Sequence, residues 1–190
     1  MLRDCIAKLF GRKSKKTNQE VKTKEINQPA NDVIHSPIKG KFVNLSDAKD
    51  PVFVSGALGD GFAVEFDHYS GVVPVFSPVE GVVEMLFATK HAVTIKANNN
   101  ALVFVHIGID TVKLDGQGFE SVVKQGDKVK VGKVLVNVDL DLVHSKGYTS
   151  DVHVTVLPES NYKAVKFLAD RSTSDTVVLS EPIAEVELNK

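Results

Sequence analysis

The sequence predicts an all-β sandwich or barrel, and three observations support this fold class. Short runs rich in valine, isoleucine and phenylalanine, a composition typical of strands, occur at 72–76, 93–95 and 102–107. Turn residues punctuate the chain, as at 59–61 and 126–127. A strand-forming segment also occurs twice. With 190 residues, 43% of them hydrophobic, the chain can form one domain with a proper core.

The N-terminal region predicts a short amphipathic helix and a linker. Apolar residues of the first turns share one helical stripe: Leu2, Cys5, Ile6, Leu9 and Phe10. Gly11 ends this stripe and four cations follow, so we expect residues 1–16 to bind an anionic membrane surface weakly. Residues 17–34 are polar and predict a flexible linker, which leaves 35–190 as the folded domain.

A ten-residue segment recurs within the folded region. SPIKGKFVNL at 36–45 matches SPVEGVVEML at 77–86. In both copies a proline, which cannot donate to a sheet, opens the segment, and a glycine lets the backbone bend before a strand resumes. The recurrence predicts two related β-motifs that pack together, although S-P-x-x-G is also a common turn sequence.

Two histidines are expected to face each other across a hairpin. Asparagine tolerates the positive φ of tight turns, so Asn98 and Asn99 predict a turn between two apolar strands. If the turn centres on these two residues, paired residue numbers sum to 197 and His91 lies opposite His106. The same register gives two apolar pairs on that face: Val93 with Phe104, and Ile95 with Leu102.

Paired imidazoles in apolar surroundings suit phosphoryl transfer. A neutral imidazole is nucleophilic at pH 7, so one histidine could accept a phosphoryl group while the other donates a hydrogen bond to its oxygens. The Thr89 hydroxyl could orient that second ring. No Walker loop is present, which argues against a nucleotide-using kinase. A zinc site or a purely structural pair remains open on spacing alone.

One segment resembles the phosphorylation signature of a known family, the glucose-type IIA proteins of the bacterial PEP-dependent sugar phosphotransferase system. It reads HIGIDTV at 106–112 and continues with Leu114, Gly116, Gly118 and Phe119. Further segments follow in the family's order: GDG at 59–61, SPVEG at 77–81, TKHA at 89–92 and GDKVKVG at 126–132. The resemblance covers roughly residues 35–190.

The resemblance implies a β-sandwich of duplicated hybrid-motif type and a phosphotransferase component with a phosphohistidine intermediate. His106 would accept the phosphoryl group from phospho-HPr, and His91 would assist transfer with Thr89 nearby. The recipient would be a cysteine on the IIB domain of a sugar permease. Regulatory targets such as adenylate cyclase or glycerol kinase occur for some family members.

The resemblance also implies a docking face around the two histidines. Asp50 and Asp110 would meet basic groups on the partners. We expect an exposed apolar patch beside them, made of Val52, Phe53, Leu58, Phe87, Phe104 and Val112.

Composition limits the other partners and the location. Twenty-three basic and 24 acidic residues give a net charge of −1, which argues against nucleic acid. A single cysteine, Cys5, suits a reducing compartment. No apolar run approaches the roughly 20 residues of a spanning helix. We therefore expect a cytoplasmic protein that is peripheral at the inner face of the membrane.

Three other functions compete with this interpretation. His106 and Asp110 have the H-x-x-x-D spacing of a zinc peptidase, but His144 and His153 do not form the H-x-H pair that such an enzyme needs. A lipoyl or biotinyl carrier would need a lysine at a hairpin tip. A regulatory binding protein of the same fold would keep the same site.

Transfer itself needs no cofactor. Zinc held by His91 and His106 with a partner's carboxylate is a separate hypothesis.

Overall fold

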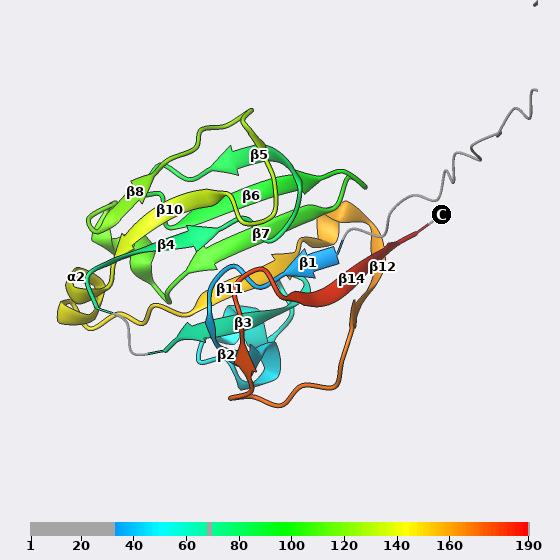
Figure 1. The fold of residues 1–190 in the computed structure, drawn as a ribbon, viewed down its shortest axis with the longest axis horizontal. Coiled ribbons are helices and arrows are strands. Elements are labelled where there is room, and N and C mark those ends of the chain that lie inside the picture. The colour runs from blue at the N-terminus through cyan, green and yellow to red at the C-terminus, as the bar shows by residue number, and fades with distance from the viewer. Residues whose placement is uncertain (1–32, 68–69, 190) are drawn as a thin grey trace, which may run out of the picture.

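The computed structural model describes residues 33–67 and 70–189, which form three antiparallel sheets (Figure 1). The strands in chain order are β1 (Val33–His35), β2 (Gly40–Asn44), β3 (Asp60–Phe66), β4 (Val72–Phe76), β5 (Gly81–Leu86), β6 (Ala92–Ala97), β7 (Leu102–Ile107), β8 (Phe119–Ser121), β9 (Lys128–Val129), β10 (Val134–Asp139), β11 (Val152–Val156), β12 (Tyr162–Phe167), β13 (Thr176–Val177) and β14 (Pro182–Leu188). The described helices are α1 (Pro51–Val54), α2 (Leu140–Ser145) and three 3-10 turns, η1 (Leu45–Asp47), η2 (Thr111–Leu114) and η3 (Pro158–Ser160). The predicted all-β sandwich is confirmed.

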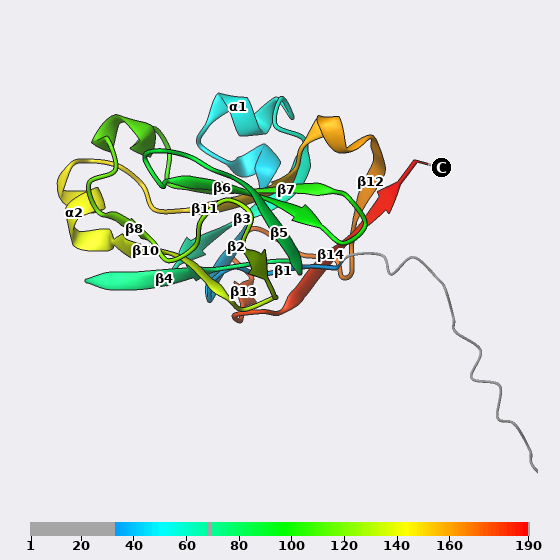
Figure 2. The same ribbon diagram turned by 90° about the horizontal axis from the view of Figure 1, so that it is seen from above.

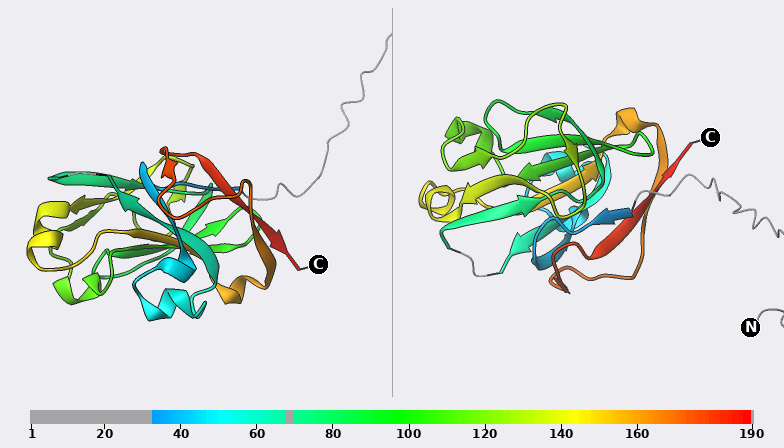
Figure 3. Two further views of the ribbon diagram at one scale, coloured as in Figure 1. Left: turned by 90° about the horizontal axis from the view of Figure 1, so that it is seen from below. Right: turned by 45° about the horizontal axis from the view of Figure 1, so that its top comes forward.

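The largest sheet has eight strands in the order β13-β2-β3-β11-β7-β6-β5-β9. Two smaller sheets, β4-β10-β8 and β1-β14-β12, complete the sandwich. Figure 2 shows β4, β1 and β14 on one side of β6, β7 and β11, and α1 on the other side. In Figure 3, α2 and the C-terminal end of the chain lie at opposite ends of the molecule.

The main core lies between the large sheet and the two smaller ones. Strand residues alternate between the two faces of a sheet, so every second residue of β6 and β7 enters this core. These residues are Val93, Ile95, Val103, Val105 and Ile107, all fully or almost fully buried. The intervening residues of β7 face outward and belong to the functional site.

The repeated segment has the same local structure in both copies. The Ser36 hydroxyl donates to the Ile38 carbonyl at 2.6 Å, and the Ser77 hydroxyl donates to the Val79 carbonyl at 2.7 Å. The copies also bond to each other: His35 N–H donates to the Pro78 carbonyl at 2.9 Å, and Phe76 N–H donates to the Pro37 carbonyl at 3.0 Å. The two motifs are therefore packed together, as the recurrence predicts.

The glycine in each copy is required by a close backbone approach. Gly40 opens β2 and Gly81 opens β5. A Cβ at Gly40 would lie 1.9 Å from the Glu65 carbonyl oxygen, and one at Gly81 would lie 2.2 Å from the Lys96 carbonyl oxygen. β13 pairs with β2 at the first glycine and β9 pairs with β5 at the second, so the duplication extends into the edge strands of the large sheet.

The register predicted for the β6–β7 hairpin is wrong by one residue. Ala92 pairs with His106, and Val93 pairs with Val105 rather than with Phe104. The loop is longer than expected because Asn100 adopts a positive φ of 73° and donates its N–H back to Ala97. Val93 and Ile95 consequently lie in the main core, on the face opposite the histidines.

The predicted helix and basic segment at 1–16, and residues 17–32 of the predicted linker, lie outside the described residues. β1 begins at Val33, so Val33 and Ile34 belong to the sandwich. Within the part of the chain that the structure describes, no helix is long and apolar enough to cross a membrane.

Candidate functional site

Four paired residues from adjacent strands lie in a row on the face of the large sheet that is turned away from the main core. His106 on β7 pairs with Ala92 on β6 and with His153 on β11, and His153 pairs with Ala63 on β3. Paired residues in an antiparallel sheet point to the same face, so two imidazoles stand side by side between two small side chains. The small side chains leave room above the sheet for the rings.

His91 reaches His106 from outside the strand pairing. It is the residue before β6, and Lys90 before it has a positive φ of 59°, which turns the chain at this point. The rings of His91 and His106 lie with centroids 5.0 Å apart at an interplanar angle of 89°. The predicted proximity of the two histidines is therefore confirmed, although the register from which it was inferred is not.

Thr89 holds the ring of His91. Its hydroxyl lies 2.6 Å from Nδ1 of His91. When the hydroxyl donates to Nδ1, the proton of the neutral ring lies on Nε2. Burial lowers the pKa of His91, which favours this neutral form. His91 can then donate a hydrogen bond from Nε2 to an anion held at His106.

His106 is kept neutral by its surroundings. Burial lowers its pKa to about 3, with His91 and His153 acting in the same direction and the Gly108 backbone and Asp110 opposing them. Nδ1 is buried and makes no hydrogen bond of normal geometry to any described residue. The residue as a whole is only half-buried, and its other nitrogen, Nε2, is a nucleophile when Nδ1 carries the proton.

The segment after His106 is fixed against the start of β11. Gly108 has a φ of 70°, and a Cβ there would lie 2.3 Å from the carbonyl oxygen of Thr149. Its N–H donates to the Asp151 carbonyl at 2.8 Å, and the next N–H, of Ile109, donates to the Thr149 hydroxyl at 3.2 Å. These contacts explain why a glycine follows His106 by two positions.

The two predicted carboxylates differ in their surroundings. Asp50 caps α1, because its side chain accepts the Val52 N–H at 2.8 Å. Asp110 is exposed, has a φ of 62°, and forms an ion pair with Lys113 at 2.7 Å. The sequence analysis did not identify Lys113, although a basic residue three positions after the signature aspartate is the available signal.

The predicted docking residues form an exposed rim over a buried floor. Val52 and Val112 are 47% and 49% exposed, whereas Leu58 and Phe87 are half-buried. Phe53 and Phe104 are only 2% and 6% exposed and pack with Ala92 in a second small core. The expectation that all six side chains are exposed is wrong for these two phenylalanines, since they support the rim from below.

His153 is a site residue that the sequence analysis missed. It is completely buried beside His106, with ring centroids 6.2 Å apart. The signal lies in the VHVTV pattern of 152–156, where alternation places a histidine and a threonine on the face opposite three core valines. Only the pairing of β11 with β7 shows which other residues share that face.

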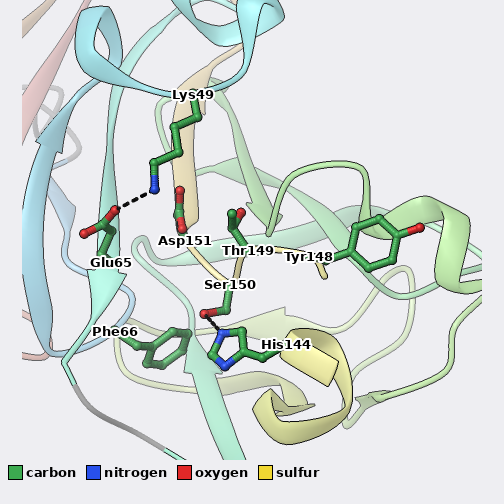
Figure 4. Close-up of a pocket in the computed structure, with 8 residues that line it drawn as sticks. All are labelled: Lys49, Glu65, Phe66, His144, Tyr148, Thr149, Ser150 and Asp151. Carbon is green, nitrogen blue, oxygen red and sulfur yellow. Dashed lines mark hydrogen bonds and ion pairs between the residues drawn. The ribbon is translucent and has the colours of Figure 1, made fainter. Parts of the chain in front are cut away.

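A pocket of about 330 Å³ lies beside the signature segment but does not include the histidine pair (Figure 4). Its lining is mixed: Phe66 and Tyr148 lie among polar side chains, with Lys49 directed toward Glu65 at 3.7 Å and the His144 ring 3.0 Å from the Ser150 hydroxyl. Thr149, which contacts the Gly108 segment, belongs to the same wall. The histidine pair thus lies outside this pocket, on the other side of the Gly108 segment.

The described residues do not contain a complete metal site. Among residues 33–67 and 70–189, no group of three or more His, Cys, Asp or Glu side chains could hold a metal ion. Asp110, the carboxylate of the H-x-x-x-D spacing, pairs with Lys113 instead. The described residues therefore lack the ligand set of a zinc peptidase. The adjacent rings of His91 and His106 provide at most two nitrogens.

The fold and site together define a phosphoryl-carrying domain: a β-sandwich with a neutral, half-buried histidine beside a second, oriented imidazole. Comparison with known families agrees with this class. Residues 32–162 match the family described as phosphoenolpyruvate-dependent sugar phosphotransferase system, EIIA 1. The chain belongs to this family, and it is a phosphotransferase component that carries phosphoryl groups in the sugar phosphotransferase system.

Individual relatives support the assignment. The chain is 39% identical over 150 residues to a glucose-specific EIIA component of Staphylococcus epidermidis, covering 78% of this chain and 81% of that protein. It is 42% identical over 143 residues to the beta-glucoside-specific EIIBCA component of Bacillus subtilis, covering 74% of this chain but 23% of that longer protein. The solved glucose permease IIA from Mycoplasma capricolum matches with a TM-score of 0.64 and 33% identity, over 80% of this chain and 93% of that one.

Proposed function

We propose that His106 is the phosphoryl acceptor, that it receives the group from phospho-HPr, and that it passes the group to a cysteine of an IIB domain. The observation that carries this proposal is the neutral, half-buried His106 ring, whose Nδ1 is buried, beside the oriented ring of His91. Histidine is the natural acceptor here because a neutral imidazole is a nucleophile at pH 7.

Transfer is a displacement at phosphorus in each direction. The lone pair on Nε2 of His106 forms the new N–P bond while the bond between phosphorus and the donor breaks. When the N–P bond forms, the ring acquires one positive charge for as long as Nδ1 keeps its proton. The negative phosphoryl oxygens offset this charge, and loss of the proton from Nδ1 removes it. In the onward step a thiolate of the recipient attacks phosphorus, and the N–P bond to His106 breaks.

His91 stabilises the transferring group without forming a bond to phosphorus. Its Nε2–H points toward charge that develops on the phosphoryl oxygens, and its orientation is set in advance by Thr89. The low exposure of His91 strengthens this hydrogen bond, since water does not compete for it. Thr89 and His91 therefore act together as one donor.

The docking face surrounds these rings. The exposed valines Val52 and Val112 would contact the apolar surface of HPr or the IIB domain. Asp50 and Asp110 flank them and would attract basic side chains of those partners. HPr and the IIB domain would then use the same surface in turn, because there is one acceptor nitrogen to reach.

The decisive experiment is labelling with PEP, enzyme I and HPr. His106→Gln should take up no phosphoryl group, because it lacks the nitrogen that forms the covalent bond. His91→Gln should still be labelled but should pass the group to the IIB cysteine far more slowly. The label should be labile in acid and stable in base, as expected for a phosphoramidate.

His144→Gln is the matched control. This histidine faces the neighbouring pocket and bonds to Ser150, so its replacement should change neither labelling nor onward transfer. An acid-stable label, or a label retained by His106→Gln, would place the phosphoryl group on another residue.

The names of the relatives suggest the system that is served. Since they act in glucose-specific and beta-glucoside-specific systems, the recipient is proposed to be the IIB domain of a glucose-type permease at the cytoplasmic face of the membrane. Residues 1–16 would hold the chain near anionic lipids. Regulatory targets such as adenylate cyclase or glycerol kinase would compete for the same docking face.

A shared zinc site is a separate hypothesis that the two histidines permit. His91 and His106 would supply two nitrogens, and a carboxylate on a bound partner would supply a third ligand. Titration calorimetry with each carboxylate-bearing partner, with and without zinc, tests it. Equal affinities in both conditions would remove the hypothesis and leave phosphoryl transfer untouched.

A further inference from the structure

His153 is an unusual residue for its position in the sheet. Its neighbours Val152 and Val154 are apolar core residues, whereas His153 is completely buried on the opposite face. Neither ring nitrogen makes a hydrogen bond to any described residue. The backbone groups of Asp151 and His106 lie close enough to affect its pKa, but not in hydrogen-bonding geometry. Burying unpaired polar atoms destabilises a fold, so a specific role for the ring is expected.

The contact that the ring does make is with Phe53. The two rings are stacked, with centroids 4.1 Å apart and an interplanar angle of 13°. The Phe53 ring also meets the His106 ring edge-on, with centroids 5.4 Å apart at 61°. Phe53 therefore lies flat on His153 and borders the acceptor histidine at the same time. Aromatic contacts of both kinds are favourable and restrict ring orientation.

Phe53 is the attachment point of α1. This helix has four residues, and Phe53 is its one buried side chain. Val52 and Val54 on either side are 47% and 48% exposed. A helix this short has little stability of its own and takes its position from tertiary contacts. The surface on which Phe53 rests thus determines where the exposed valines lie.

We propose that His153 is a positioning residue: its flat ring seats Phe53, and through Phe53 it sets both the docking helix α1 and one side of the His106 ring. This inference rests on the proposed function, since it assigns α1 to the surface that HPr contacts. A branched aliphatic side chain would fill similar volume but would offer no flat face. The stacked ring therefore links partner docking on α1 to the geometry of the acceptor.

The test compares an aliphatic and an aromatic replacement in the full chain. His153→Leu keeps an apolar side chain but removes the flat ring, so the Kd for unphosphorylated HPr and the KM for phospho-HPr should both rise about tenfold. The kcat should change less than about threefold, because the His106 ring keeps its contacts with His91 and Phe104 on its other sides. His153→Phe retains the stacking face, and its Kd should stay within about threefold of the wild-type value.

Two further variants separate positioning from general destabilisation. Thr155→Val replaces a buried, unpartnered hydroxyl on the same face of β11, and it should leave the Kd unchanged. Phe53→Leu removes the other half of the stack and should weaken HPr binding by a similar factor. The double variant with His153→Leu should then bind no more weakly than Phe53→Leu alone, because both changes break one contact.

Several results would overturn the inference. Wild-type Kd and KM in His153→Leu would show that the ring does not position α1. If His153→Phe binds HPr as weakly as His153→Leu does, the effect belongs to the imidazole nitrogens and not to the flat ring. If the losses of HPr affinity add up in the double variant, His153 does not act through Phe53. Loss of labelling in the wild-type chain would instead remove the proposed function, so the two failures are distinguishable.

Discussion

The hydroxyl of Thr89 lies 2.6 Å from Nδ1 of His91, and the His91 ring in turn meets the His106 ring with centroids 5.0 Å apart. Thr89→Val removes this contact while keeping the shape of the side chain. We expect labelling of His106 to persist and onward transfer to the IIB domain to slow by about 10-fold. Removing a donor outright costs about 100-fold or more, and Thr89 only orients the donor His91.

Thr89→Ser is the matched variant for that prediction, because it restores the hydroxyl. Its transfer rate in rapid-quench assays should return to within a few-fold of the wild-type rate. Equal rates for the valine and serine variants would show that the threonine does not orient His91.

Acid should destabilise the protein through its site histidines. The pKa of His106 falls from 6.5 in the unfolded chain to about 3 in the folded one, so folding favours the neutral ring. The stability that this ring contributes is complete above pH 6.5 and is lost progressively as the pH falls toward 3. At pH 5 the loss from His106 is roughly 2 kcal/mol.

Urea unfolding at pH 7 and pH 5 measures this loss, and His106→Gln is the comparison. The unfolding free energy of this variant should differ less between the two pH values than that of the wild-type chain, because glutamine does not titrate. Burial also lowers the pKa of His91 and of His153, so part of the acid sensitivity should remain. An unchanged difference would mean that His106 is not desolvated in solution.

Gly108→Ala should disrupt the signature segment. The Cβ would lie 2.3 Å from the Thr149 carbonyl oxygen, in addition to the strain of a positive φ. Gly126→Ala is a control with a φ of 89° and no atom within 4 Å of the added Cβ. We expect the control to cost about 1–2 kcal/mol of unfolding free energy and Gly108→Ala clearly more, with loss of labelling.

The two flanking aspartates should respond differently to replacement. Asp50→Ala removes the cap of α1 and should lower the unfolding free energy by about 1 kcal/mol, as well as weakening HPr binding. Asp110→Asn removes an exposed ion pair with Lys113 but tolerates the positive φ of this position, so it should weaken binding with little change in thermal stability. Both effects on binding should shrink as salt is raised. Salt-independent losses would argue against charge recognition.

Residues 1–16 should increase partitioning onto anionic vesicles. The basic residues after Gly11 are expected to contribute about 1 kcal/mol each near such a surface. Vesicle sedimentation should therefore recover more of the full-length chain than of a chain lacking 1–16, and neutral vesicles should abolish the difference. Equal recovery on anionic vesicles would contradict the prediction.

The sequence by itself determined the fold class and the duplication, and it singled out the histidine pair. Strands show as alternation and turn residues, which are local signals, so β4 and β7 have the predicted bounds. The repeated glycines mark places where one backbone approaches another. The signature segment identified His106 through a resemblance, and Thr89 and His91 lie close enough in sequence to be recognised with it.

Only the tertiary structure decided which residues surround His106. A one-residue change in the loop at Asn100 shifts the β6–β7 register, and no local signal distinguishes the two loop lengths. His153 reaches the site through the pairing of β11 with β7, a contact between residues 47 positions apart. Burial of Phe53 likewise depends on the ring beneath it. These contacts join residues that are far apart in the chain, so the sequence around each residue does not reveal its partners.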